Sequence, residues 1–150
     1  MLFVRFTMKL FVLAALILLA GCTSPGNFGI YDAKTGEILF DEEDVVYYNW
    51  TSHTITLSET GIQKLPRTRT LDMDGWHQRE FMVRLGDEEL YRGRFWNPIS
   101  SASPDGVTID LLRAQQEEVL VLQYSDGRGK DPRAVNSLRR HFQSNRKIEE

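Results

Sequence analysis

A run of apolar residues without a single charge, residues 10–20, is the feature that most constrains this chain. The run is 11 residues long, whereas a helix that spans a bilayer needs about 20 apolar residues. Two bases, Arg5 and Lys9, accompany it, and residues 1–21 contain no acid. Basic residues followed by a short apolar run are typical of a secretory signal peptide. The sequence therefore predicts that residues 1–21 are a leader and that the remainder folds after export.

The residues at the end of the run are Leu19, Ala20, Gly21 and Cys22. An aliphatic residue, two small residues and a cysteine resemble the lipobox of bacterial lipoproteins. The resemblance implies that the leader is removed just before Cys22 and that the thiol of this residue carries the lipid. Several acyl chains hold a protein to a bilayer stably, whereas one chain binds only marginally. Cys22 is the only cysteine, so no disulfide can form within the chain.

Residues 22–27 form a short tether in this interpretation, with Pro25 and Gly26 as turn residues. Thr23 follows the cysteine. In the sorting pattern of lipoproteins an Asp at this place tends to retain the protein at the inner membrane. The resemblance therefore implies an outer-membrane location facing the periplasm if the source has two membranes.

Charge and composition narrow the class of the exported part. The chain carries a net charge of −3 and is 41% hydrophobic. Because the leader holds two bases and no acid, the remaining 129 residues carry −5. This balance excludes a disordered chain and a strongly basic nucleic-acid-binding protein. Residues 28–150 are long enough for one domain with its own core.

Alternation of apolar and polar residues predicts several strands in this domain. Lys34-Thr35-Gly36 and Gly86-Asp87 lie between alternating segments and predict two hairpins. The predicted strands are residues 28–31, 37–40, 53–57, 80–85, 89–95, 106–112 and 119–124.

Three short helices are also expected. Asp41 predicts the start of one that runs through Tyr48. A second begins after Ser58 and ends at Pro66, and Asp131 predicts the start of the last. The apolar face of the last helix contains Val135, Leu138 and Phe142. The pattern predicts an α+β fold: a mostly antiparallel sheet with short helices on one side and a C-terminal helix.

Residues 40–45, 53–61 and 81–91 follow one another in an order that resembles the first periplasmic domain of SecD-type protein-export subunits. The segment Gly93-Arg-Phe-Trp-Asn-Pro-Ile-Ser-Ser101, with Asp131-Pro-Arg133 later in the chain, is similar to a group of uncharacterised secreted proteins. In that group, a loop of this kind follows the hairpin and the Asp-Pro-Arg sequence opens the last helix. The resemblance implies that residues 37–140 have the same fold as these domains.

Candidate catalytic and metal-binding residues are few. The histidines are His53, His77 and His141, and no two lie within four residues of each other, so we expect no metal site and no cofactor. One enzymatic alternative is a hydrolase in which His53 or His77 activates a serine of the loop at residues 100–103. This alternative has no Gly-x-Ser-x-Gly motif to support it.

Two segments suit binding better. Phe95, Trp96 and Ile99 surround a proline-containing stretch, and they form a partner surface if exposed or part of the core if buried. Arg139 and Arg140 belong to a basic C-terminal segment that either lies on anionic lipid or is a solvated helix face. The sequence thus favours a lipid-anchored, non-enzymatic binding module, with the membrane (through Cys22) and another envelope protein as partners.

Overall fold

The structure is a computed structural model that describes residues 26–125 and 129–150. The predicted leader and Cys22 lie outside these residues. Within the described part, no helix combines the length and the apolar character needed to cross a membrane.

The strands of the described residues form one nine-stranded sheet. Its spatial order is β2-β1-β5-β6-β7-β8-β4-β3-β9. The strands are β1 (Phe28–Asp32), β2 (Ile38–Asp41), β3 (Val45–Asn49), β4 (Thr54–Leu57), β5 (Glu80–Leu85), β6 (Glu88–Trp96), β7 (Val107–Asp110), β8 (Val119–Tyr124) and β9 (Ile148–Glu149). The helices are η1 (Glu42–Asp44, a 3-10 turn), α2 (Glu59–Gln63), α3 (Leu111–Glu117) and α4 (Asn136–Ser144).

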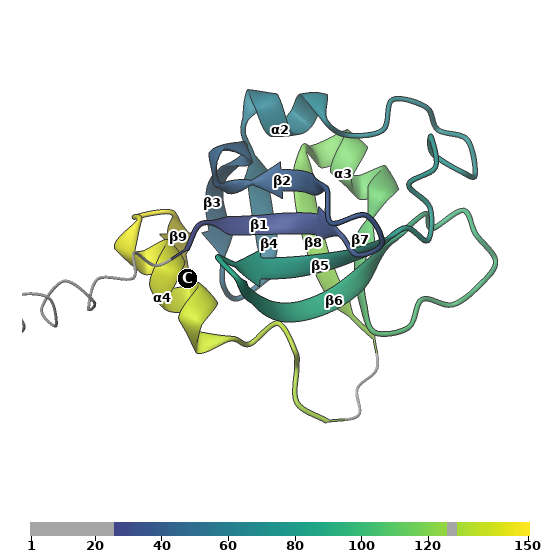
Figure 1. The fold of residues 1–150 in the computed structure, drawn as a ribbon. Helices are drawn as coiled ribbons and strands as arrows, with labels where there is room; N and C mark the ends of the chain where they lie inside the picture. The colour runs from purple at the N-terminus through teal and green to yellow at the C-terminus, as the bar shows by residue number, and fades with distance from the viewer. Residues whose placement is uncertain (1–25, 126–128) are drawn as a thin grey trace, which may run out of the picture.

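The sheet is mostly antiparallel, as the sequence predicts, but it is mixed and strongly curled. β6 pairs with β7 in parallel, and so does β3 with β9. Figure 1 shows the sheet curling into a half-barrel. α2 and α3 lie together beside it, whereas α4 lies at a different place, at the end where the chain begins, so the helices do not all share one side.

The curl follows from the connection between β2 and β3. β2 is one edge of the sheet and β3 lies next to the opposite edge, yet only the three residues of η1 join them. The Asp41 side chain accepts from the Glu43 backbone N–H, and the Asp44 side chain accepts from the Asp41 N–H at 2.8 Å. The predicted helix start is therefore present, but the helix ends at Asp44 and does not reach Tyr48. The following residues pair with β4, and β-branched and aromatic side chains favour this extended state.

α4 supplies an aromatic ring that packs against β1 and β3. The Phe142 ring stacks on Tyr48 of β3 at 5.1 Å and packs on Phe28 of β1 at the same centroid distance. The predicted apolar face of α4 is confirmed, but the predicted start of this helix is wrong. α4 begins after Val135, which makes no side-chain capping bond. Asp131 binds Arg133 instead.

The strand predicted over residues 106–112 is too long. β7 ends at Asp110, whose carboxylate accepts from the Arg113 backbone N–H and caps α3. The helix ends at Glu118 in the left-handed conformation, with φ of 59°. A helix that the sequence prediction omitted therefore separates β7 from β8.

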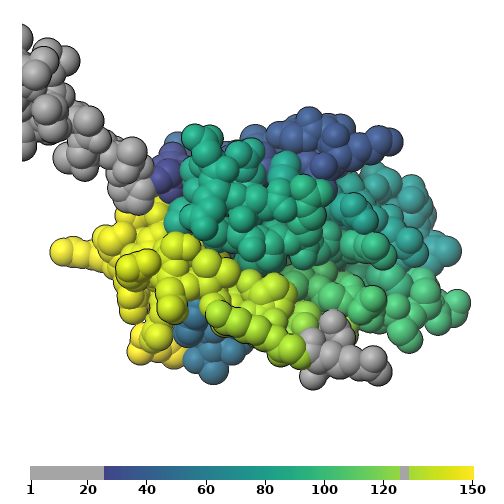
Figure 2. All heavy atoms as spheres, turned by 60° about the horizontal axis from the view of Figure 1, so that its bottom comes forward, coloured from purple at the N-terminus to yellow at the C-terminus, as the bar shows by residue number. Residues whose placement is uncertain are grey.

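The two ends of the domain are formed by different parts of the chain (Figures 1 and 2). Gly26, the first described residue, packs on the turn between β5 and β6, where a Cβ on Gly26 would lie 2.1 Å from Gly86 Cα. α4 lies at this same end, which we call the proximal end. The loops at residues 64–79 and 97–106 extend from the opposite end, and we call them the distal loops.

Candidate functional site

A buried amide joins the two distal loops. Asn97 follows β6 directly and has no exposed surface. Its Nδ2 donates to the carbonyl oxygens of Thr70 at 3.2 Å and Leu71 at 3.0 Å, and its Oδ1 accepts from the Ile99 N–H at 3.1 Å. Its own backbone N–H donates to His77 Nδ1 at 3.1 Å. One side chain thus fixes the backbones of Leu71 and Ile99 relative to each other.

The same arrangement leaves large apolar side chains in water. Ile99 is 60% exposed and Leu71 is 58% exposed, the two highest values among large apolar residues in the described part. Trp96 is half-buried, with its ring 5.2 Å from the His77 ring in an edge contact. Contiguous exposed apolar patches mark interaction sites, and these side chains belong to backbone segments that Asn97 joins, so we take them as the candidate interaction surface.

The predicted aromatic segment therefore divides into two parts. Phe95 belongs to β6, not to a loop, and its ring is fully buried against Trp76 at 4.7 Å and Phe81 at 5.1 Å. Ile99, beyond the strand, is the member that faces solvent. Of the two alternatives for this segment, burial in the core thus applies to Phe95, and exposure to a partner applies to Ile99.

The first distal loop is also held from within. Both oxygens of Asp74 are used: Oδ2 accepts from the backbone N–H groups of Arg67 at 3.0 Å and Thr68 at 3.1 Å, and Oδ1 accepts from the Thr68 hydroxyl at 2.8 Å. The Thr68 bonds hold the pKa of Asp74 below its usual range. From α3, Gln115 Nε2 donates to the carbonyls of Thr68, at 3.0 Å, and Pro66. This loop is therefore an ordered part of the surface, although it contains no helix or strand.

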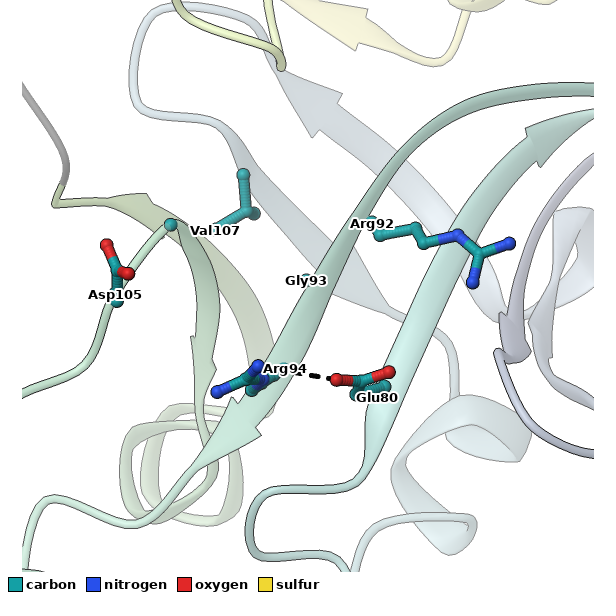
Figure 3. Close-up of a pocket in the computed structure, with 7 residues that line it drawn as sticks. Glu80, Arg92, Gly93, Arg94, Asp105 and Val107 are labelled. Carbon is teal, nitrogen blue, oxygen red and sulfur yellow. Dashed lines mark ion pairs between the residues drawn. The ribbon is translucent and has the colours of Figure 1, made fainter. Parts of the chain in front are cut away.

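A depression in the surface lies where β6 separates from β7 (Figure 3). Its volume is about 300 Å³. It is lined by Glu80, Arg92, Gly93, Arg94, Asp105, Gly106 and Val107. Both arginines already have carboxylate partners, Arg94 with Glu80 at 3.4 Å and Arg92 with Glu89 at 2.7 Å. The cleft therefore presents little uncompensated positive charge to a ligand.

His53 lies in a buried polar network. Its Nδ1 is 2.6 Å from the Tyr48 hydroxyl, and its Nε2 is 3.9 Å from Asp131 Oδ2. Arg133 makes two bonds to the Asp131 carboxylate and a third to the Leu122 carbonyl. The network connects the segment before α4 to β3 and β8.

Burial and charge set the protonation of this network. Desolvation lowers the pKa of His53, and the nearby Arg133 lowers it further. Hydrogen bonds from Arg133 lower the pKa of Asp131 to about 2. Burial raises the pKa of Tyr48. Near neutral pH we therefore expect the His53 imidazole and the Tyr48 phenol to be neutral, beside an ion pair between Asp131 and Arg133. These protonation states stabilise the fold.

The residues of the hydrolase alternative are not brought together. Among the described residues, neither His53 nor His77 hydrogen-bonds to a serine, and His77 Nδ1 is occupied by the Asn97 N–H. His141 is buried and bonded to Glu42 at 2.7 Å. Within the described ranges, no three His, Cys, Asp or Glu side chains form a cluster that could hold a metal ion.

The basic C-terminal segment is largely used inside the domain. Arg139 pairs with Glu150 and lies over the Trp50 ring at 5.5 Å. Lys147 Nζ donates to two backbone carbonyls, those of Glu42 and Val45. Arg140 is exposed and has no ion pair among the described residues, so of the two predicted partner-binding bases it is the one that remains available to a partner.

Sequence reasoning missed Asn97, Asp74 and Leu71, because their roles depend on hydrogen bonds between loops. No protein family, curated protein or solved structure matches the chain.

Proposed function

We propose that this protein is a lipid-anchored module of the bacterial cell envelope that binds a partner protein through its distal loops and does no chemistry itself. The observation that supports this function best is the placement of Leu71 and Ile99. Both side chains are exposed, both backbones are bonded to one buried amide, and both lie in loops at the end of the domain opposite Gly26.

The anchor orients this surface. Cys22 precedes Gly26 by four residues, and four residues of extended chain reach at most about 14 Å. Lipid on Cys22 would therefore hold the proximal end, with α4 and Gly86, next to the bilayer. The distal loops would then point away from that membrane, toward other envelope proteins. In a source with two membranes, we expect the outer membrane, facing the periplasm.

The fixed backbone of the loops favours binding. An interface loses affinity when flexible loops must be ordered on association. Asn97, Asp74 and Gln115 order these loops before any partner is present. Ile99, Leu71 and the accessible edge of Trp96 would form the apolar centre of such an interface, where the largest contributions to binding energy are found.

Site-specific photo-crosslinking in living cells tests this proposal. A photoreactive residue replaces Ile99 or Leu71 in the full chain, and Ile38, which is 44% exposed on the edge strand β2, serves as the matched control position. We expect one protein adduct from positions 99 and 71, none from position 38, and loss of membrane retention and of acyl mass in Cys22→Ala. Adducts of equal strength at all three positions, or none at 99 and 71 in the retained protein, would refute the binding role. An unmodified Cys22 with the leader still attached would refute the anchor.

A further inference from the structure

A groove borders the first distal loop, on the side of α2. It has a volume of about 390 Å³. It is lined by Ile62, Gln63, Leu65, Pro66, Arg67, Arg69 and Gln115. Leu65 and Pro66 are buried and Ile62 is half-buried, so the floor is apolar. Arg67 and Arg69 are exposed.

These two arginines carry charge that the domain does not neutralise. Among the residues that the structure describes, no carboxylate lies within ion-pairing distance of either guanidinium group. The acids of this loop make bonds to other groups: Asp74 accepts from the backbone N–H groups of Arg67 and Thr68 and from the Thr68 hydroxyl, and Asp72 accepts from the Gly75 N–H. Gln115, on the groove wall, donates to backbone carbonyls. Arg113, which lies on α3 two residues before Gln115, is paired with Glu117 at 2.9 Å.

In the described part of the chain, more arginines have a carboxylate partner than lack one, and Arg67 and Arg69 share the unpaired state with Arg84, Arg140 and Arg146. Residues 22–150 carry a net −5, so carboxylates are in excess. Arginines with a carboxylate partner are Arg79, Arg92, Arg94, Arg113, Arg133 and Arg139. Arg67 and Arg69 are two residues apart on a loop whose backbone is fixed, so their starting points on the groove rim are fixed as well.

We propose that this groove binds an extended acidic peptide segment of the partner protein, with an aliphatic side chain on the Leu65–Pro66 floor and carboxylates on Arg67 and Arg69. A guanidinium group binds a carboxylate through two parallel hydrogen bonds, which gives geometric selection as well as attraction. The apolar floor requires a side chain beside the acid, and a peptide supplies both. This inference rests on the proposed function and names the chemistry of its partner.

The position of the groove favours a peptide over a lipid headgroup. The groove lies next to the distal loops, at the end away from Gly26, so an anchor at Cys22 would hold it away from the bilayer. A phosphate would use the two arginines but would leave the apolar floor uncovered.

Selection from a random peptide library displayed on phage tests the inference. The target is the mature lipidated chain, held in nanodiscs of neutral phosphatidylcholine. We expect the enriched peptides to carry Asp or Glu beside Leu, Ile or Val. Their affinity should fall about tenfold or more in the double variant Arg67→Gln/Arg69→Gln, because two charged contacts are lost. The matched control Arg92→Gln/Arg94→Gln removes the same charge from the cleft between β6 and β7 and should leave the affinity unchanged.

Three results would overturn the inference: no enrichment, enriched peptides without acids, or equal binding in the Arg67/Arg69 variant and the wild type. Capture of phosphatidylglycerol vesicles that is lost in the same variant would assign the arginines to lipid and would also overturn it. The crosslinking experiment separates the two proposals. Adducts at positions 71 and 99 without peptide selection leave the binding role in place and remove only the acidic-peptide groove.

Discussion

Asn97 offers the sharpest test of how the distal loops are held. Asn97→Ala removes three hydrogen bonds, two from Nδ2 to Thr70 and Leu71 and one from Ile99 to Oδ1. Each bond contributes about 1 kcal/mol net, and because the loop carbonyls can regain water, we expect a loss of about 2 kcal/mol in the free energy of unfolding. Urea unfolding followed by tryptophan fluorescence measures this loss, since Trp76 and Trp96 lie next to the site.

Asn97→Asp refines the same argument. The introduced carboxylate has the shape of the amide, but it cannot donate to the carbonyls of Thr70 and Leu71. Burial and these carbonyls would raise its folded-state pKa above the ordinary value of about 3.9. The folded state then binds more protons than the unfolded state, so stability falls as pH rises through the folded-state pKa. We expect a larger deficit at pH 7 than near pH 4.

Hydrogen exchange locates the effect. The amide of Ile99 should lose its protection in Asn97→Ala but keep it in Asn97→Asp, whose carboxylate can still accept from this N–H, while amides in the middle of β5 and β6 should keep theirs in both variants after correction for global stability. An Asn97→Ala protein within about 0.5 kcal/mol of the wild type, the range of ordinary surface substitutions, with Ile99 still protected, would refute the claim that this amide fixes the loops.

Three further substitutions test the rest of the structure. Phe142→Ala should cost about 3–5 kcal/mol of unfolding free energy in a urea titration, the range for deletion of a buried aromatic ring; a cost near zero would mean that α4 does not fill the sheet. Gly93→Ala should cost about 1–3 kcal/mol by overpacking, since its Cβ would lie 2.5 Å from the Val107 carbonyl oxygen, and an unchanged Tm would contradict the parallel β6–β7 contact. His53→Gln should flatten the acid limb of the stability curve. Burial lowers the pKa of His53, so the unfolded state binds more protons and wild-type stability is lost as pH falls below about 6.5; equal slopes in thermal melts across pH 5–7 would refute this.

Local patterns predicted much of the sheet. Alternation with a Gly-Asp turn identified the β5–β6 hairpin, and Gly36, at φ of 73°, lies in the predicted turn between β1 and β2. The same patterns misplaced three boundaries: the end of the helix that starts after Asp41, the end of β7 and the start of α4. Asp110 begins a helix because its carboxylate caps α3, and residues 111–117, which follow it, are good helix formers. The strand pattern that precedes Asp110 obscured this signal.

Long-range contacts explain what the sequence did not predict. The parallel pairing of β6 with β7 depends on how residues 97–106 cross over, which no periodicity encodes. For the candidate site, burial of Phe95 follows from strand parity once β6 extends to Trp96. The exposure of Ile99 does not, because Asn97 binds carbonyls 26 and 27 residues away. Similarly, the guanidinium group of Arg139 is neutralised by Glu150, which lies 11 residues later in the chain.

The position of Phe142 in the sequence has a consequence for biogenesis. Its ring packs on Phe28 of β1 and on Tyr48 of β3, so this part of the core is completed by a helix that is synthesised after β1 to β8. Until α4 has emerged from the ribosome, the first three strands have no ring to close upon, and a core of such non-local contacts forms slowly. A chain that cannot fold early stays extended, and an extended chain is the form that can be threaded through a narrow export channel. If the chain carries the leader that its sequence predicts, delayed completion of the core would keep it competent for export.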